Sequence, residues 1–273
     1  MMRKGFFERN FTEGWKNVFN RFLSEDGFAL LYSTFYVVTL GGTRLLIDPC
    51  LRLPWMAQAI GERITADFDA ADGILISHAH VDHFCPNAIR ASEKSETPWY
   101  VPEIIPAPCR EKMGLAPERV QKSIRDGETF RIGSITVTAF SMPHTDADGS
   151  HVMPEFGYLL EGNGKRLFFP MDIRNYDPAF LPKIGQPDMA FLHVWLGRAK
   201  ALDLPCEPEL TQFCTYAEQI GAKRVVLAHL QDMARTPEDR WTFTHCGLIA
   251  DRLFETCPQT HVLVPQYGTW YNI

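Results

Sequence analysis

The sequence of 273 residues predicts an α/β fold in which two layers of β-sheet carry helices on their outer faces. Runs rich in β-branched and aromatic residues recur along the chain and are separated by turn residues, which is typical of strands. Segments with apolar residues three or four positions apart lie between several of these runs and indicate helices. No Ser/Gly-rich linker interrupts this alternation, so we expect a single domain over residues 1–273.

The chain begins with an amphipathic segment at about residues 6–23. Its large apolar residues recur at spacings near three and four, as on one face of a helix. They are Phe7, Phe11, Trp15, Phe19, Phe22 and Leu23. Residues 1–26 hold five basic and four acidic side chains, too balanced a mixture for a polybasic membrane anchor. We therefore expect a helix whose apolar stripe is buried against the domain or against a second subunit.

Strands are expected where the β-branched and aromatic runs end in turn signals. The first two, at residues 30–40 and 43–47, flank Gly41-Gly42 and predict a hairpin. Further strands are expected at residues 73–77, 134–141, 156–160, 166–169, 189–194, 224–228 and 261–264. Helices are expected near residues 86–94, 209–220 and 247–255. Strands and helices thus interleave over the whole chain.

The composition disfavours several classes of protein. The chain has 27 basic and 33 acidic side chains, a net charge of −6 and no basic run, which disfavours dedicated nucleic-acid binding. No apolar run approaches the ~18 residues of a membrane span, and the N-terminus lacks the apolar stretch of a secretory signal. The seven cysteines include no C-x-x-C pair and fit reduced thiols. These features predict a cytoplasmic protein.

The strongest functional signal directly follows one of the expected strands. The run SHAHVDH at residues 77–83 holds three imidazoles and one carboxylate. In an extended chain His78 and His80 point the same way, because side chains alternate with period two. A turn would then carry Asp82 and His83 to a second point. Since imidazole and carboxylate groups are zinc ligands, this one loop is predicted to serve two metal ions.

Three further candidate ligands also follow expected strands. These are His144, Asp172 and His229. Strand ends gather along one rim in layered α/β folds, so we expect these residues to converge with the loop at 77–83. Two divalent ions ~3.5–4 Å apart need an anionic bridge, for which Asp172 is the candidate. His151 is an alternative to His144, which we prefer because it lies nearer to the strand.

These residues resemble the pattern of the metallo-β-lactamase superfamily of metallohydrolases over roughly residues 28–264. The resemblance is carried by Leu46-Ile47-Asp48-Pro49, by the H-x-H-x-D-H run at 78–83, and by the three later ligands in the expected order. It implies a four-layer αββα sandwich. It also implies one metal ion on His78, His80 and His144, a second on Asp82, His83 and His229, and Asp172 as the bridge.

Within the superfamily, the Asp48-Pro49 ending and the Phe-Gly-Tyr-Leu run at 156–159 are most similar to one branch. That branch contains ascorbate-phosphate lactonase and N-acyl-phosphatidylethanolamine phospholipase D. Two features depart from the common pattern. Met171 precedes Asp172 where relatives usually have glycine, so the backbone there must differ or tolerate a side chain. The residues after His83 are Phe-Cys-Pro, which disfavours glyoxalase II activity.

Together the resemblance and the ligand chemistry predict a dinuclear metal-dependent hydrolase. Metal coordination lowers the pKa of water from about 15.7 towards ~7, which supplies a metal-bound hydroxide at neutral pH. Two divalent metal ions carry more positive charge than Asp82, Asp172 and a bridging hydroxide offset. The site is therefore expected to favour an anionic small-molecule ester, lactone or phosphodiester. The resemblance implies that Asp82 also assists proton transfer to the leaving group. Zinc is the preferred metal, with manganese or iron as alternatives.

Three more residues near the expected rim are candidate substrate contacts: His193, Arg198 and His245. For both histidines a structural role is an equally open interpretation. Cys85 adjoins the metal loop, has no second cysteine near it in the sequence, and is expected to be a buried structural thiol. Two other functions stay open, a mononuclear iron dioxygenase on the same fold and a non-catalytic metal-binding protein. Association into a homo-oligomer also stays open.

Overall fold

The computed structural model describes residues 2–145, 152–194, 196, 205, 207–237 and 240–273. The backbone groups into two compact units. The first unit consists of Met1–Arg125, Phe130–Thr136 and Gln266–Ile273, and the second of Asp126–Thr129 and Val137–Pro265. The single domain expected over residues 1–273 stays a prediction.

The first unit is built on a seven-stranded sheet in the order β14-β1-β2-β3-β4-β5-β6. The strands are β1 (Gly27–Tyr32), β2 (Phe35–Leu40), β3 (Thr43–Ile47), β4 (Gly73–Leu75), β5 (Trp99–Pro102), β6 (Val120–Ile124) and β14 (Trp270–Asn272). The pairs from β14 to β3 are antiparallel, and those from β3 to β6 are parallel. The single strand expected at residues 30–40 is wrong, because a turn with Ser33 at φ 42° divides it into β1 and β2.

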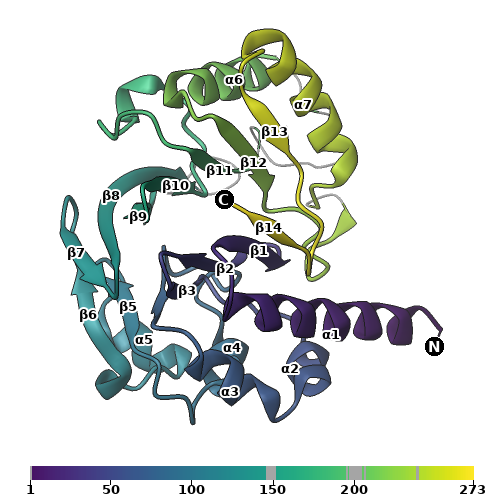
Figure 1. The fold of residues 1–273 in the computed structure, drawn as a ribbon, viewed down its shortest axis with the longest axis vertical. Helices are drawn as coiled ribbons and strands as arrows, with labels where there is room; N and C mark the ends of the chain where they lie inside the picture. The colour runs from purple at the N-terminus through teal and green to yellow at the C-terminus, as the bar shows by residue number, and fades with distance from the viewer. Residues whose placement is uncertain (1, 146–151, 195, 197–204, 206, 238–239) are drawn as a thin grey trace. The chain divides into compact units, whose positions relative to one another are not determined.

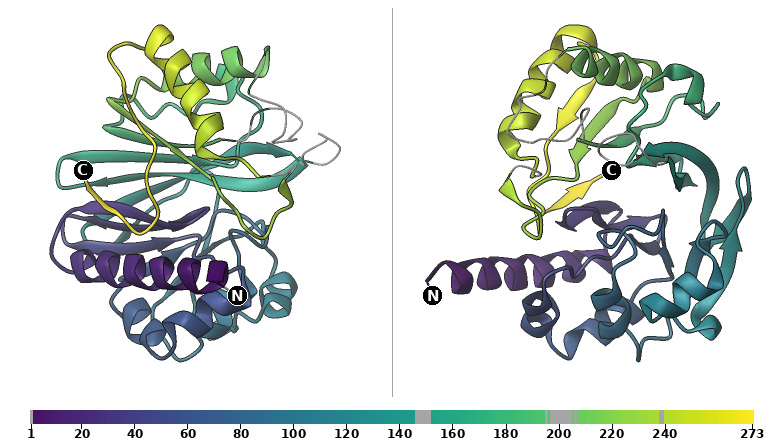
Figure 2. Two further views of the ribbon diagram at one scale, coloured as in Figure 1. Left: turned by 90° about the vertical axis from the view of Figure 1, so that its right-hand side faces the viewer. Right: turned by 180° about the vertical axis from the view of Figure 1, so that it is seen from behind.

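Short helices and one long helix accompany this sheet (Figure 1). They are α1 (Met2–Phe22), α2 (Pro54–Ile60), α3 (Arg63–Asp69), α4 (Pro86–Ala91), α5 (Ala107–Met113) and the 3-10 helix η1 (Pro117–Arg119). Helix α1 runs alongside β1, β2 and α2, as both views of Figure 2 show. The Trp15 indole N–H donates to Asp67 Oδ2 at 2.6 Å and fixes this helix to α3.

The apolar stripe of α1 is buried in part. Trp15, Phe19 and Phe22 are buried, and Phe11 is half-buried. Leu23 is 61% exposed, so it is not buried against the domain, and its burial against a second subunit stays a prediction. Consecutive helical residues point about 100° apart, so Phe22 and its neighbour cannot both face the sheet. The side chain of Phe7 lies outside the described residues.

The second sheet has the strand order β13-β12-β11-β10-β9-β8-β7. The strands are β7 (Thr129–Ile132), β8 (Ile135–Thr145), β9 (Val152–Gly162), β10 (Lys165–Met171), β11 (Met189–His193), β12 (Arg224–Ala228) and β13 (His261–Leu263). Within the second unit, β9 and β10 are antiparallel, whereas β10 to β13 form a parallel series. Parallel neighbours end at the same edge, which brings the residues after β10, β11 and β12 together.

Two amphipathic helices, α6 (Glu209–Ile220) and α7 (Phe243–Thr256), cover the parallel strands of the second unit (Figure 1). Phe213 and Tyr216 of α6 and Leu253 of α7 share one apolar core with Leu192 and Leu227 of the strands. The 3-10 helix η2 (Pro178–Phe180) packs beside α6. Two mixed sheets with flanking helices confirm the predicted α/β class.

Candidate metal centre

The first set of candidate metal ligands lies in the donor loop, residues 77–83, which follows β4. His78, Asp82 and His83 are buried and His80 is half-buried. The loop turns back at its end, where the N–H groups of His83 and Phe84 both donate to His80 O. The turn expected near residues 81–83 is thus present in the first unit.

Asp48 is the main partner of this loop. It directly follows β3, the parallel neighbour of β4, and its carboxylate is fully buried. Its oxygens accept from Ser77 N at 2.8 Å and Ser77 Oγ at 2.6 Å, and Oδ2 lies 2.7 Å from His83 Nδ1. Because an ionised carboxylate only accepts, it places the His83 proton on Nδ1 and leaves Nε2 as the nitrogen that could bind a metal ion. This role was not predicted from the sequence.

Ser77 orients the next histidine. Its hydroxyl lies 2.9 Å from His78 Nδ1, and it is already bonded to Asp48. His78 Nε2 in turn lies 3.0 Å from His80 Nδ1. These two nitrogens therefore approach one point from two rings, as two ligands of one ion do.

Asp82 is held at both its backbone and its side chain. The hydroxyl of Thr34 donates to Asp82 O at 2.5 Å. Arg52 Nη1 lies 3.5 Å from Asp82 Oδ2. The carboxylate predicted to bind metal therefore carries a cationic partner within the first unit.

The second set comes from four separate strand ends of the second unit. His144 lies near the end of β8, Asp172 follows β10, His193 ends β11 and His229 follows β12. All four are buried. His193 Nδ1 makes a short hydrogen bond with Asp172 Oδ1, and His229 Nε2 lies 3.4 Å from Asp172 Oδ2. Ligand atoms of Asp172, His193 and His229 lie within 4.8 Å of one another, as do those of Asp172 and His144.

The backbone around this set is strained at two positions. Met171 has φ 63° and His229 has φ 62°, both in the left-handed region that favours glycine. The chain thus keeps at Met171 the conformation that glycine would adopt, and tolerates a buried side chain there. The departure from the glycine pattern is therefore one of residue type and not of conformation.

The backbone of Asp172 has a buried partner of its own. The N–H of Asp172 donates to Glu155 Oε2 at 3.1 Å, and Glu155 is fully buried.

The remaining predicted residues have different outcomes. His193 lies against Asp172 and His229, so it can ligate a metal ion as well as contact substrate. His245 forms a capping box with Thr242 at the start of α7, since its Nδ1 accepts from Thr242 N at 2.9 Å. This contact supports the structural interpretation of His245. Arg198 and His151 lie outside the described residues.

Cys85 is buried, as expected, but it does have a second cysteine beside it. The Cys50 thiol donates a hydrogen bond to Cys85, which together with backbone N–H groups outweighs burial and lowers the pKa of Cys85 to about 6. The two cysteines are far apart in sequence and meet because the loops after β3 and β4 pack together. Sequence spacing could not reveal this pair.

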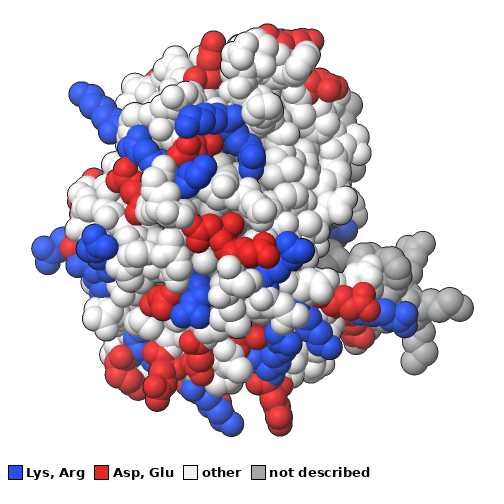
Figure 3. All heavy atoms as spheres, in the orientation of Figure 1, with Lys and Arg blue, Asp and Glu red and all other residues white. Residues whose placement is uncertain are grey.

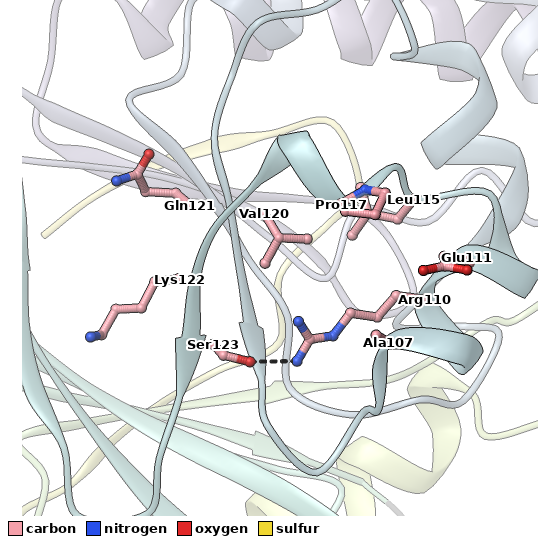
Figure 4. A pocket seen from close by; sticks show the side chains of 9 residues that line it. All are labelled: Ala107, Arg110, Glu111, Leu115, Pro117, Val120, Gln121, Lys122 and Ser123. Atoms are coloured by element: carbon pink, nitrogen blue, oxygen red, sulfur yellow. Dashed lines mark hydrogen bonds between the residues drawn. The ribbon is translucent and has the colours of Figure 1, made fainter.

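Other parts of the surface give no comparable cluster among the described residues. A pocket of the first unit is lined by Arg110, Glu111, Leu115 and Lys122, among others (Figure 4). The Arg110 guanidinium is used by the fold, donating to Ile105 O, Pro102 O and Ser123 Oγ. On the face shown in Figure 3, acidic and basic side chains are interspersed. None of the described helices has the length and apolar character needed to cross a bilayer.

A family profile described as "Beta-lactamase superfamily domain" matches residues 43–230, more than half of the chain. The chain belongs to the metallo-β-lactamase superfamily. This confirms the resemblance predicted from the sequence and the fold class that it implies. The match includes the donor loop and all four later donors, and it ends just after His229.

Two curated relatives share 27% identity with the chain. One is a UPF0173 metal-dependent hydrolase from Polaromonas sp., similar over 62% of this chain and 67% of the relative. The other is an atrochrysone carboxyl ACP thioesterase from Aspergillus fumigatus, similar over 56% of this chain. That match spans about a third of the thioesterase, 34% of its length.

Solved structures agree with the superfamily fold. A putative metal-dependent hydrolase from Parabacteroides distasonis has a TM-score of 0.56 and 20% identity, covering 88% of this chain and 92% of that one. CmlA, a diiron β-hydroxylase from Streptomyces venezuelae, has a TM-score of 0.65 and 15% identity, covering 91% of this chain and 54% of that one. At these identities the likeness shows the fold alone.

Proposed function

We propose that the chain is a dinuclear metal-dependent hydrolase that cleaves an ester, lactone or phosphodiester bond of an anionic small molecule. The observation that carries the proposal is the pair of largely buried donor sets, each made of imidazoles and carboxylate at strand ends. Superfamily membership and the similarity to a metal-dependent hydrolase support hydrolysis as the reaction type. A cytoplasmic location is part of the same proposal.

The proposed ligands follow the superfamily pattern. One ion is assigned to His78, His80 and His144, the other to Asp82, His83 and His229, and Asp172 is assigned to both. Imidazole and carboxylate donors suit zinc, iron and manganese, and we prefer zinc. Bound ions of this kind acidify water and stabilise the negative charge that develops on the scissile oxygen.

The protein's own contribution is to fix the ligands before metal binds. Asp48 and Ser77 set which nitrogen of His83 and His78 stays available. His193 holds one oxygen of Asp172 and so orients its carboxylate. Asp82 is proposed to pass a proton to the leaving group, and His193 to contact the substrate. Arg198 stays a predicted substrate contact.

An iron oxygenase is the second candidate. The same donors accept iron, and the fold is shared with a diiron β-hydroxylase. Because of the likeness to a thioesterase, thioesters belong in the substrate panel. A non-catalytic metal-binding protein is the third alternative. These functions differ in oxygen use and turnover, so one set of assays separates them.

The test combines metal analysis with an activity screen of the protein prepared without chelator. We expect about two ions per chain and oxygen-independent hydrolysis of anionic esters, lactones or phosphodiesters. Asp172→Asn should lose more than one ion's affinity and reduce turnover by roughly a hundredfold or more, because it removes a shared ligand. Asp251→Asn, an exposed change on α7, is the matched control.

Three outcomes would contradict the proposal. Oxygen consumed in step with substrate would establish the iron alternative. Two bound ions without turnover on any compound would favour a binding protein. Full activity of Asp172→Asn with both ions retained would remove the assigned bridge.

A further inference from the structure

The segment at residues 49–53, between β3 and α2, is fixed to the donor loop and to α4. Asn87 of α4 donates from Nδ2 to Leu51 O at 3.0 Å and to Arg52 O at 3.1 Å. Asp48, directly before the segment, is bonded to the donor loop as described above. The backbone of Arg52 therefore has a defined position beside the proposed metal ligands of the first unit.

The Arg52 side chain lies between a buried carboxylate and solvent. Its Nη1 is 3.5 Å from Asp82 Oδ2, and the side chain is 24% exposed, against 3% for the side chain of Asp82. The Arg52 side chain is thus partly in contact with solvent, whereas the Asp82 carboxylate beside it is not. Guanidinium is planar and matches carboxylate or phosphate groups through two parallel hydrogen bonds.

We propose that Arg52 is a specificity-determining residue that binds the anionic group of the substrate, an inference that rests on the proposed function. When a divalent cation shares the Asp82 carboxylate, it offsets the attraction between that carboxylate and Arg52. The guanidinium then attracts a second anion more strongly on its exposed side. The Arg52–Asp82 ion pair is then the arrangement before substrate binds. The anionic group of the substrate balances the charge of the guanidinium once the metal ion shares the Asp82 carboxylate.

The alternative is that Arg52 only positions Asp82. The two roles predict different effects of substitution. A residue that recognises an anion changes anion affinity and KM while the metal content stays constant. A residue that only positions a ligand changes metal content and kcat, whatever the charge of the substrate.

The first experiment titrates inorganic phosphate into zinc-loaded protein by calorimetry, with zinc content measured in the same samples. Arg52→Met should weaken phosphate binding roughly tenfold, because a charge-assisted hydrogen bond is lost. The phosphate affinity of Arg52→Lys should lie between those of the wild type and Arg52→Met. Arg125→Met, which removes a guanidinium whose side chain is 77% exposed, should bind as the wild type does.

The second experiment compares matched anionic and neutral esters. Arg52→Met should raise KM for the anionic ester by roughly tenfold, with kcat and the neutral ester unchanged. Phosphate affinity within twofold of wild type would overturn the inference, and so would a loss of zinc that parallels the loss of phosphate. A wild type that hydrolyses nothing would contradict the proposed function, while the phosphate titration would still decide the role of Arg52.

Discussion

The two donor sets contain the same residue types but are assembled in different ways. In the first unit, four candidate ligands lie within the single donor loop at 77–83, and hydrogen bonds to Asp48 and Ser77 orient the rings of His83 and His78. In the second unit, His144, Asp172, His193 and His229 come from four strands, and the register of the parallel strands brings the last three together. The first set is thus contiguous in sequence and is oriented by side-chain hydrogen bonds, whereas the second is assembled by the register of the strands.

Among substitutions that distinguish the two ways of assembling a donor set, the one at Asp48 is expected to have the largest effect. Asp48→Asn replaces an acceptor by an amide and weakens the control of the His83 proton. We expect metal affinity to fall by about 10- to 100-fold, the usual range for losing the partner of a ligating histidine. A competition titration against a chromogenic chelator measures the metal affinity.

Asp72→Asn is the control for this prediction. Asp72 also lies in the first unit and accepts from Arg44 N at 2.8 Å, away from the donor loop. Its replacement should leave metal affinity unchanged. If Asp48→Asn bound metal as tightly as this control, the first set would be oriented by the sheet alone, and the contrast between the two sets would disappear.

The same contrast explains what the sequence could predict of the site. The donor loop is visible because its ligands are contiguous and follow a recognisable strand. His144, Asp172 and His229 were predicted from strand ends together with a family pattern. That His193 lies against Asp172 and His229 depends on β11 pairing between β10 and β12, and pairing between distant strands cannot be read from local periodicity.

Several elements of the fold escaped prediction for related reasons. Helices α2 and α3 have seven residues each, too few for a clear 3.6-residue period. Strand β14 has three residues and exists through its pairing with β1, at the other end of the chain. The role of Asp48 depends likewise on β3 and β4 being parallel neighbours. Elements defined by long-range pairing were the ones that the sequence did not reveal.

The next effect concerns Glu155, which supports the backbone of the second set. Glu155→Ala removes the acceptor of the Asp172 N–H in a buried place, whereas Glu155→Gln keeps an oxygen there. We expect Glu155→Ala to lower the free energy of unfolding by about 1 to 2 kcal/mol more than Glu155→Gln does. Urea denaturation of the two variants measures the difference. Equal stabilities would show that the sheet alone holds Asp172, with no need of this hydrogen bond.

The smallest effect concerns backbone strain, which occurs at Asp48 beside the first set and at Met171 beside the second. Asp48 has φ 47° and Met171 has φ 63°, but aspartate tolerates the left-handed region better than methionine, because its short polar side chain bonds locally. Met171→Gly and Met171→Ala both remove the buried side chain, so their difference isolates the backbone. The left-handed conformation costs alanine about 1 to 2 kcal/mol, and glycine gives back about 0.5 to 1 kcal/mol in chain entropy. Met171→Gly should therefore be more stable than Met171→Ala, by up to about 1.5 kcal/mol in urea denaturation. If the alanine variant were the more stable one, the turn before Asp172 would not be strained.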